Sequence, residues 1–228
     1  MTRPFYHVVF ARPSRLARIA VILGLALASF GAIGRSAEAL PYHQDFENVE
    51  VGKVPAEFLV LDGGFEVKQE GDNRFLELPG SPLDSYAVQF GPAETENVSV
   101  AACFKSRAKG RRFPVFGIGL NGVSGYRLQV NPAKNAIELY QDQALKKSVP
   151  YEWKTGAWLN LKLCLQKTSE GAWNIQGKAW PKDSPEPGEW LLIANESQKP
   201  QAGRASVFGN PFAGTPIQFD NFQIERVK

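Results

Sequence analysis

The chain has 228 residues, 43% of them hydrophobic and 21% charged, and its formal net charge at pH 7 is +3. Residues 1–39 hold five of the 26 Lys and Arg residues but only one of the 23 Asp and Glu residues, so the remaining 189 residues carry 21 basic and 22 acidic side chains, a net charge of −1. That balance removes the main electrostatic argument for nucleic-acid binding, and 189 residues are enough for one domain with a substantial core.

The first 39 residues have the three parts of a signal peptide. Four arginines between positions 3 and 18 precede an almost entirely apolar run over 19–33, and Ala37-Glu38-Ala39 places small residues where a signal peptidase cleaves. The apolar run is shorter than the ~20 residues that span a bilayer, which disfavours a membrane anchor. We therefore predict a signal-peptide helix over 1–39, cleavage before Leu40, and a periplasmic or extracellular domain that does not associate with the membrane.

From residue 40 onward, short runs of alternating apolar and polar residues are separated by Gly, Pro, Asn and Asp, a pattern typical of β-strands. The clearest run, 158–167, places four leucines at alternate positions. The predicted strands are 41–47, 58–61, 65–70, 74–78, 86–90, 97–106, 114–120, 125–130, 136–140, 143–149, 158–167, 173–180, 190–195, 203–208 and 216–227. This spacing predicts an all-β, two-sheet antiparallel jelly-roll sandwich over 40–228, without an internal domain boundary.

Gly117-Ile118-Gly119-Leu120-Asn121-Gly122 matches the spacing of a dinucleotide-binding loop. That function requires a helix after the loop, because the pyrophosphate sits on the helix N-terminus. Asn121-Gly122 is instead a turn signal, and the alternating run 125–130 follows it. The motif therefore predicts a β-hairpin.

Two cysteines, Cys103 and Cys164, lie in predicted strands. After export the protein would be in an oxidising compartment, where a disulfide can form. Both cysteines occupy the polar phase of their strands. A disulfide between them is predicted if the two strands are neighbours, and the alternative is a pair of free thiols on different strands.

The strand 216–227 contains a change of phase, because its apolar residues switch faces at Asp220-Asn221. A period-2 strand changes phase only through a bulge or kink. We predict that the first and last strands pair, because this pairing hides a sheet edge that would otherwise be exposed. Asp45 and Glu47 then come close to Asp220, and three converging carboxylates call for a hard cation such as calcium. The alternatives are a structural calcium site at Asp45, Glu47 and Asp220, or a simple bend without any cofactor.

Catalytic signatures are sparse. His43 is the single histidine after residue 39, and there is no H-E-x-x-H, C-x-x-C or G-x-S-x-G motif. Jelly-roll glucanases usually carry E-x-D-x-x-E on one strand, and the nearest match, Asp45-Phe46-Glu47, lacks the third acid. A carboxylate pair drawn from separate strands stays open.

Several segments taken together resemble a known group of proteins. They are Asp45-Phe46-Glu47, Val51-Gly52-Lys53-Val54-Pro55, Gly117-Ile118-Gly119-Leu120, Gly125-Tyr126-Arg127-Leu128-Gln129-Val130, Trp158-Leu159-Asn160-Leu161-Lys162-Leu163, Ala179-Trp180-Pro181, Glu186-Pro187, Glu189-Trp190 and Phe219-Asp220-Asn221-Phe222-Gln223-Ile224. Their order resembles exported concanavalin A-like (laminin G-like) jelly-roll domains, including those near the 3-keto-disaccharide hydrolase-like family. The resemblance covers nearly all of residues 40–228. It implies a sandwich with one concave sheet, often a carbohydrate-binding surface and sometimes bearing a structural calcium ion.

The polar face of two adjacent predicted strands supplies the candidate ligand-binding residues Arg127, Gln129, Glu138 and Tyr140. Planar polar groups and a ring suit sugar hydroxyls and the apolar face of a sugar. We expect an exported, non-catalytic, lectin-like module whose partner is a glycan or polysaccharide. The alternatives are a glycoside hydrolase or lyase acting on modified sugars, and a structural cell-envelope domain without a ligand.

Overall fold

The computed structural model describes residues 39–80 and 84–227. The predicted signal peptide, apart from Ala39, lies outside these residues, so its helix and its cleavage stay predictions. No helix within the described ranges is long and apolar enough to cross a membrane.

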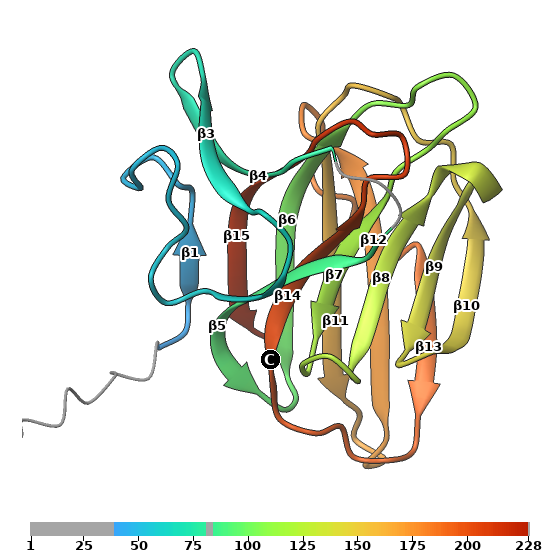
Figure 1. Cartoon of the computed structure of the whole chain (residues 1–228). Coiled ribbons are helices and arrows are strands. Elements are labelled where there is room, and N and C mark those ends of the chain that lie inside the picture. The colour runs from blue at the N-terminus through green and yellow to red at the C-terminus, as the bar shows by residue number, and fades with distance from the viewer. Residues whose placement is uncertain (1–38, 81–83, 228) are drawn as a thin grey trace, which may run out of the picture. The chain divides into compact units, whose positions relative to one another are not determined.

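The described residues form two antiparallel β-sheets that pack face to face, as predicted (Figure 1). The eight-stranded sheet has the order β13-β12-β11-β6-β15-β4-β3, with β1 also paired to β15, and the seven-stranded sheet has the order β10-β9-β8-β7-β14-β5-β2. A short 3-10 helix, Pro132–Lys134, joins β8 to β9. The strands are β1 (Tyr42–Gln44), β2 (Leu59–Asp62), β3 (Glu66–Glu70), β4 (Asn73–Leu78), β5 (Tyr86–Glu94), β6 (Val98–Ser106), β7 (Val115–Leu120), β8 (Tyr126–Asn131), β9 (Ala136–Gln141), β10 (Ala144–Pro150), β11 (Leu159–Lys167), β12 (Trp173–Pro181), β13 (Leu192–Glu196), β14 (Gly203–Asn210) and β15 (Ile217–Arg226).

The alternation in the sequence decides which side chains enter the core. In β11 the four alternating leucines are at most 5% exposed, whereas Asn160, Lys162 and Gln166 point away from the core. Successive side chains of a strand point to opposite faces, so a sheet with one buried face buries every second residue. Each buried leucine contributes about 1.5–3 kcal/mol through removal of its apolar surface from water.

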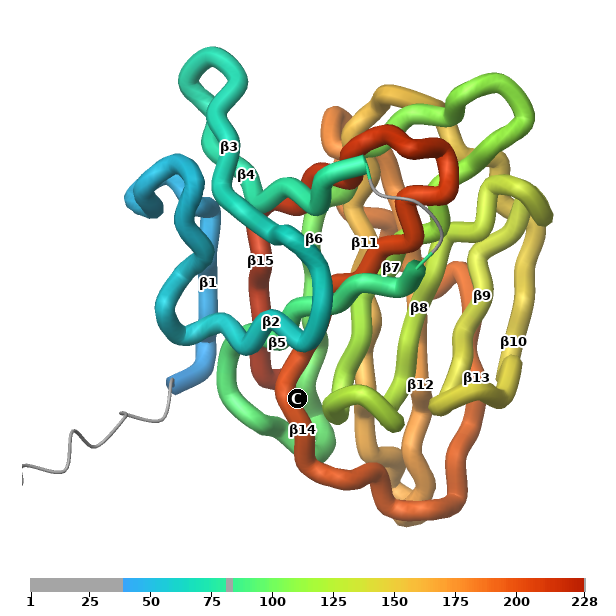
Figure 2. The backbone as a smooth tube through the Cα atoms, viewed as in Figure 1, coloured from blue at the N-terminus to red at the C-terminus, as the bar shows by residue number. Residues whose placement is uncertain are grey.

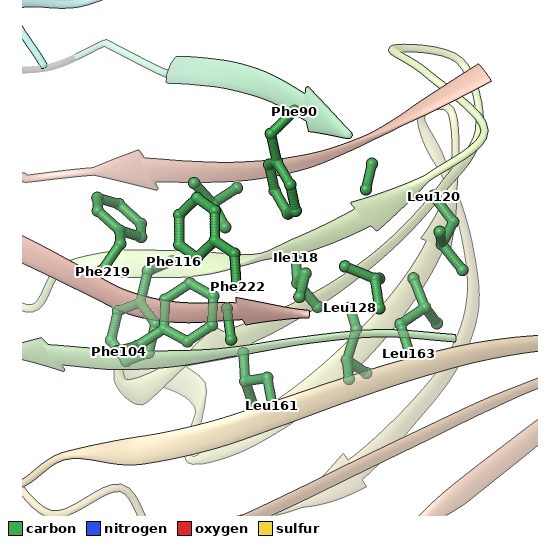
Figure 3. Packing of buried hydrophobic residues seen from close by; sticks show 14 of the residues in the cluster. Phe90, Phe104, Phe116, Ile118, Leu120, Leu128, Leu161, Leu163, Phe219 and Phe222 are labelled. Atoms are coloured by element: carbon green, nitrogen blue, oxygen red, sulfur yellow. The ribbon is translucent and has the colours of Figure 1, made fainter. Parts of the chain in front are cut away.

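Phenylalanines from both sheets meet in the core (Figure 3). Phe104 of the eight-stranded sheet stacks on Phe116 of the seven-stranded sheet, with ring centres 5.6 Å apart. Phe90 and Phe222 make a second contact between the sheets at 4.4 Å. Such ring pairs add about 0.5–1.5 kcal/mol each to the burial of their area and fix how the two sheets face one another.

The first and last strands pair, as the sequence predicted, so the described N- and C-terminal segments lie side by side (Figure 2). β15 contacts β4 along its first half and β1 along its second half. Between the halves, the register with β6 shifts between Asp220 and Gln223, and Asn221 adopts a left-handed φ of 51°. The predicted bulge is confirmed, and it lets β15 bury apolar residues in both phases.

The predicted convergence of Asp45, Glu47 and Asp220 on a cation is wrong. Glu47 accepts a hydrogen bond from the backbone N–H of Arg74 at 3.1 Å, and Asp45 accepts one from the N–H of Glu47 at 3.2 Å. Asp220 pairs with Lys182 at 3.4 Å. Within the described ranges, no group of three His, Cys, Asp or Glu side chains is placed to hold a metal ion. An ammonium group and backbone donors balance these carboxylates in place of calcium.

The predicted disulfide between Cys103 and Cys164 is also wrong, because both thiols are free and buried. Their strands are neighbours, but Cys103 lies opposite Asn160 and Cys164 opposite Ser99. The two cysteines are therefore four positions out of register. At ~3.3 Å per residue this offset is about 13 Å along the strands, far beyond the ~7 Å between Cα atoms that a bridge tolerates.

Candidate functional site

The outer face of the seven-stranded sheet carries two rows of side chains that cross β5, β14, β7, β8 and β9. The strand register places the members of each row directly opposite one another. The first row is Gln89, Ser206, Gly119, Arg127 and Tyr140; the second is Ala87, Phe208, Gly117, Gln129 and Glu138. Side chains opposite each other on one face of an antiparallel sheet lie close enough to interact, so each row forms a continuous strip.

The structure brings together the four predicted ligand-binding residues at one end of these rows. Gln129 donates a hydrogen bond to Glu138 at 2.8 Å, and the Tyr140 hydroxyl donates one at 3.2 Å. Asn131 and Lys134 donate to the same carboxylate at 3.1 and 2.8 Å. Burial alone would raise the pKa of Glu138, but the hydrogen bonds from Lys134, Gln129 and Asn131 outweigh it and hold the pKa below its ordinary value.

Glu138 is only 1% exposed, so it lies beneath its four donors. It orients Gln129 and Tyr140 and is shielded from a ligand by them. The predicted face therefore exists, with Glu138 placed to position its neighbours. Contact between this face and a ligand stays a prediction.

Arg127 lies between two aromatic rings. Its guanidinium carbon is 5.1 Å from the ring centre of Tyr140 and 5.1 Å from that of Phe208. Cation–π contacts of this kind contribute about 0.5–2 kcal/mol each and hold the guanidinium plane in place. Burial lowers the pKa of Arg127 below its ordinary value, although Tyr140, Asp142 and Glu138 oppose this shift, and the group stays charged at neutral pH.

The glycines of the Gly117–Gly122 segment shape the centre of this face. The segment forms the predicted hairpin between β7 and β8, and Asn121 takes a left-handed φ of 64° in its turn. A Cβ on Gly117 would come within 2.7 Å of the Phe208 ring, and one on Gly119 within 2.5 Å of the Ser206 hydroxyl. The absence of these two side chains therefore leaves room for Phe208 and Ser206 to lie over β7.

A groove of about 260 Å³ occupies this face above β5, β14 and β7. Arg127 and Phe208 border it on one side, and Leu61 of β2 and Val123 of the hairpin turn border it elsewhere. Leu61 and Val123 are 43% and 76% exposed, which is high for apolar side chains next to a groove. The described lining residues are Leu61, Asp62, Ser85, Tyr86, Ala87, Gln89, Gly119, Gly122, Val123, Tyr126, Arg127, Ser206 and Phe208.

Of the four ligand-binding residues predicted from the sequence, only Arg127 lines this groove, and the other described lining residues were not predicted. Gln89, Ser206 and Phe208 come from β5 and β14, which follow β7 in the sheet only because the strand order interleaves segments that are distant in the sequence. No local pattern marks these residues. The glycines at alternate positions of β7 were an available signal for the groove. Glycine in a strand interior often marks a place where another group approaches the backbone closely.

A second hollow, of about 140 Å³, lies on the outer face of the eight-stranded sheet. Trp180 and Asn160 border it, and two of its charged lining residues, Lys162 and Glu186, pair with each other. Glu186 contacts Lys162 at 3.1 Å and Lys178 at 2.7 Å, and Lys178 also stacks on Trp190 at 4.4 Å. The groove of the seven-stranded sheet is larger and is lined by Arg127, whose buried Nε has no acceptor among the described residues, so we assign the candidate site to that sheet.

No family model matches the chain, and no curated protein matches it in sequence. Solved structures share its fold. The carbohydrate-binding module CBM66 from Bacillus subtilis is similar with a TM-score of 0.53 and 8% identity, over 74% of this chain and 95% of that one. The apo Crh5 transglycosylase is similar with a TM-score of 0.57 and 9% identity, over 84% of this chain and 86% of that one. The exoplasmic domain of VIP36, solved with Ca²⁺ and Man3GlcNAc, is similar with a TM-score of 0.53 and 6% identity, over 77% of this chain and 86% of that one. The likeness confirms the predicted jelly-roll sandwich, and at such identities it establishes the fold alone.

Proposed function

We propose that this chain is a carbohydrate-binding module and that its glycan lies in the groove on the outer face of the seven-stranded sheet. The observation that carries the proposal is the composition of the groove: apolar walls from Phe208, Leu61 and Val123 surround the polar groups of Gln89, Ser206 and Arg127. Sugars have apolar ring faces and a rim of hydroxyls, so a site for them needs both kinds of surface at close quarters. The carbohydrate-binding module and the exoplasmic domain solved with Man3GlcNAc, both among the structural neighbours, support this use of the fold.

The module is proposed to bind its glycan without cleaving it. Glycoside hydrolysis ordinarily uses two carboxyl groups that flank the scissile bond. Among the described residues that line the groove, Asp62 is the one carboxylate, and its oxygen accepts a hydrogen bond from the N–H of Gly63 at 2.7 Å. Glu138, the nearest buried acid, is engaged by four donors. The transglycosylase among the neighbours makes catalysis the alternative to test.

The proposed setting is the periplasm or the extracellular medium, reached through cleavage before Leu40. The support for this proposal is the signal-peptide pattern of residues 1–39. In that setting the partner is a polysaccharide or the glycan of another molecule.

A glycan array probed with the purified protein tests the proposal. Because few polar contacts offset the cost of association, we expect a weak single site, about 4–6 kcal/mol in binding free energy. Phe208→Ala removes a wall of the groove and abolishes the signal, whereas Phe212→Ala makes the same chemical change at a ring that is 38% exposed and outside the groove. Both variants are compared at matched folded fractions. Release of reducing ends from a bound oligosaccharide would show an enzyme, and equal binding by both variants would place the site elsewhere.

A further inference from the structure

Arg127 is a partly buried cation that lacks an acidic partner. Among the described residues, no carboxylate lies within ion-pair distance of its guanidinium, and its Nε is buried without an acceptor. Glu138 sits on the neighbouring strand, but Gln129, Asn131, Lys134 and Tyr140 take up its oxygens. A buried donor without an acceptor is costly, as is a charge without a counter-charge, so this arrangement calls for a ligand.

The groove next to Arg127 is rich in donors. Gln89 is only 8% exposed, lines the groove, and its side-chain amide makes no hydrogen bond to any described residue. Ser206 lies between Gln89 and the β7 glycine in the same cross-strand row. An amide, a hydroxyl and a guanidinium therefore lie along one row, while the single described carboxylate of the lining, Asp62, belongs to the edge strand β2.

These observations define a ligand chemistry within the proposed function, on which the inference rests. We propose that the groove selects glycans that carry an anionic group, the carboxylate of a uronic acid or a sulfate ester, and that Arg127 binds this group. A guanidinium presents paired N–H donors that match two oxygens of such a group. The rings of Tyr140 and Phe208 fix the plane of that fork before the ligand arrives, which lowers the entropic cost of binding.

Matched polysaccharide pairs test the charge requirement on the unmodified protein. Polygalacturonate is compared with its methyl ester, and dextran sulfate with dextran, by titration calorimetry at low salt. The charged member of at least one pair is expected to bind about tenfold tighter or more than its neutral partner, as for a charge-assisted hydrogen bond. Raising the ionic strength to about 0.5 M should reduce this preference. The pair that responds distinguishes a carboxylate from a sulfate.

Substitution of the arginine tests the residue. Arg127→Gln should bring binding of the charged member down to that of the neutral one, and Arg127→Lys should retain part of the preference, because an ammonium keeps the charge but loses the planar fork. Arg111→Gln is the control: it also removes one positive charge, but Arg111 is an exposed residue that does not line the groove.

Each outcome has a distinct meaning. Equal binding of charged and neutral members contradicts the anionic ligand while leaving glycan binding intact, and absence of binding to every polysaccharide of a broad array contradicts the proposed function as well. An equal loss in Arg111→Gln and Arg127→Gln would reveal nonspecific charge attraction and overturn the assignment to Arg127. If Arg127→Gln fails to fold, the matched pairs and Arg127→Lys still decide.

Discussion

Glu138 accepts hydrogen bonds from four side chains and is almost completely buried, so the polar end of the candidate site depends on one carboxylate. Glu138→Gln replaces an acceptor by a donor amide and leaves several of these groups unpaired. We expect the free energy of unfolding at pH 7 to fall by about 2–3 kcal/mol, since hydrogen bonds to a charged group are stronger than neutral ones. Urea denaturation of the two proteins measures the difference.

The pH dependence of that difference follows from the direction of the pKa shift. The folded state holds the pKa of Glu138 below its ordinary value, with the hydrogen bonds outweighing burial. The ionised carboxylate therefore stabilises the fold fully above the ordinary pKa of ~4.3, and this contribution disappears as the pH falls through the lower folded-state pKa. The native protein and Glu138→Gln should converge in stability below about pH 4. A constant difference down to pH 3 would contradict the role given to the ionised carboxylate.

The two cysteines offer a separate test at the residue scale. Burial raises the pKa of Cys103 and of Cys164 to about 11 in each case, so few thiolates form at pH 8. We expect negligible reaction with a thiol reagent in the folded protein and two reactive thiols per chain after unfolding without reductant. Cys164→Ser should leave one. Absence of reactive thiols in the unfolded native sequence would restore the disulfide that the register excludes.

The strand β7 shows how an element sets the shape of the site. A Cβ on Gly119 would approach the Ser206 hydroxyl to 2.5 Å, and that side chain can rotate away, whereas a Cβ on Gly117 would approach the Leu128 carbonyl oxygen to 2.1 Å. We expect Gly119→Ala to keep the fold with a loss of about 1 kcal/mol and to weaken glycan binding, and Gly117→Ala to lose about 2–3 kcal/mol. Gly188→Ala is the control, because nothing lies within 4 Å of its Cβ. Chemical denaturation and glycan titration of all three variants give the comparison, and a Gly117→Ala protein as stable as the control would refute the steric argument.

The sequence determines where the individual strands lie more fully than it determines how distant strands pair. The period-2 alternation predicted every strand within a few residues, and the phase change in β15 predicted its bulge, because both are local consequences of burying one face of a sheet. Register between distant strands carries no such local signal. For this reason Cys103 and Cys164 were correctly expected on polar faces but not four positions out of register, and Gln89 and Phe208 were not connected with Arg127.

At the scale of the whole molecule, the core and the site have opposite requirements. The aromatic and aliphatic contacts between the sheets fix the two layers, and the outer face of one layer can therefore hold a buried unpaired donor such as the Nε of Arg127 without loss of the fold. Buried unsatisfied groups are rare in native proteins and are expected at functional sites, where the rest of the fold offsets their cost. The stability that offsets the cost of these groups comes from the packing between the sheets, which includes the paired first and last strands.

Phe46 allows that cooperativity to be measured. It is completely buried, close to the described N-terminus, and its ring centre lies 5.0 Å from that of Phe222 in the last strand. All five tryptophans lie between residues 153 and 190, and the ring contacts of Phe46 are with Phe58 and Phe222, so tryptophan fluorescence follows side chains other than those that Phe46 packs on. Phe46→Ala should lower the free energy of unfolding by about 3–5 kcal/mol, because it leaves a cavity beside Phe222 of the last strand. Val51→Ala, at a side chain that is 45% exposed, should change it by less than about 1 kcal/mol.

The two probes then decide whether the sandwich unfolds as one unit. If it does, Phe46→Ala shifts the urea midpoint measured by tryptophan fluorescence by the same amount as the midpoint measured by far-UV circular dichroism, although no tryptophan is close to residue 46 in the sequence. A fluorescence midpoint that stays in place while the circular dichroism midpoint falls would mean that the paired terminal strands unfold separately. In that case the packing of β1 against β15 could not stabilise the candidate site. The stability that compensates the unpaired polar groups of the site would then have to arise within the seven-stranded sheet itself.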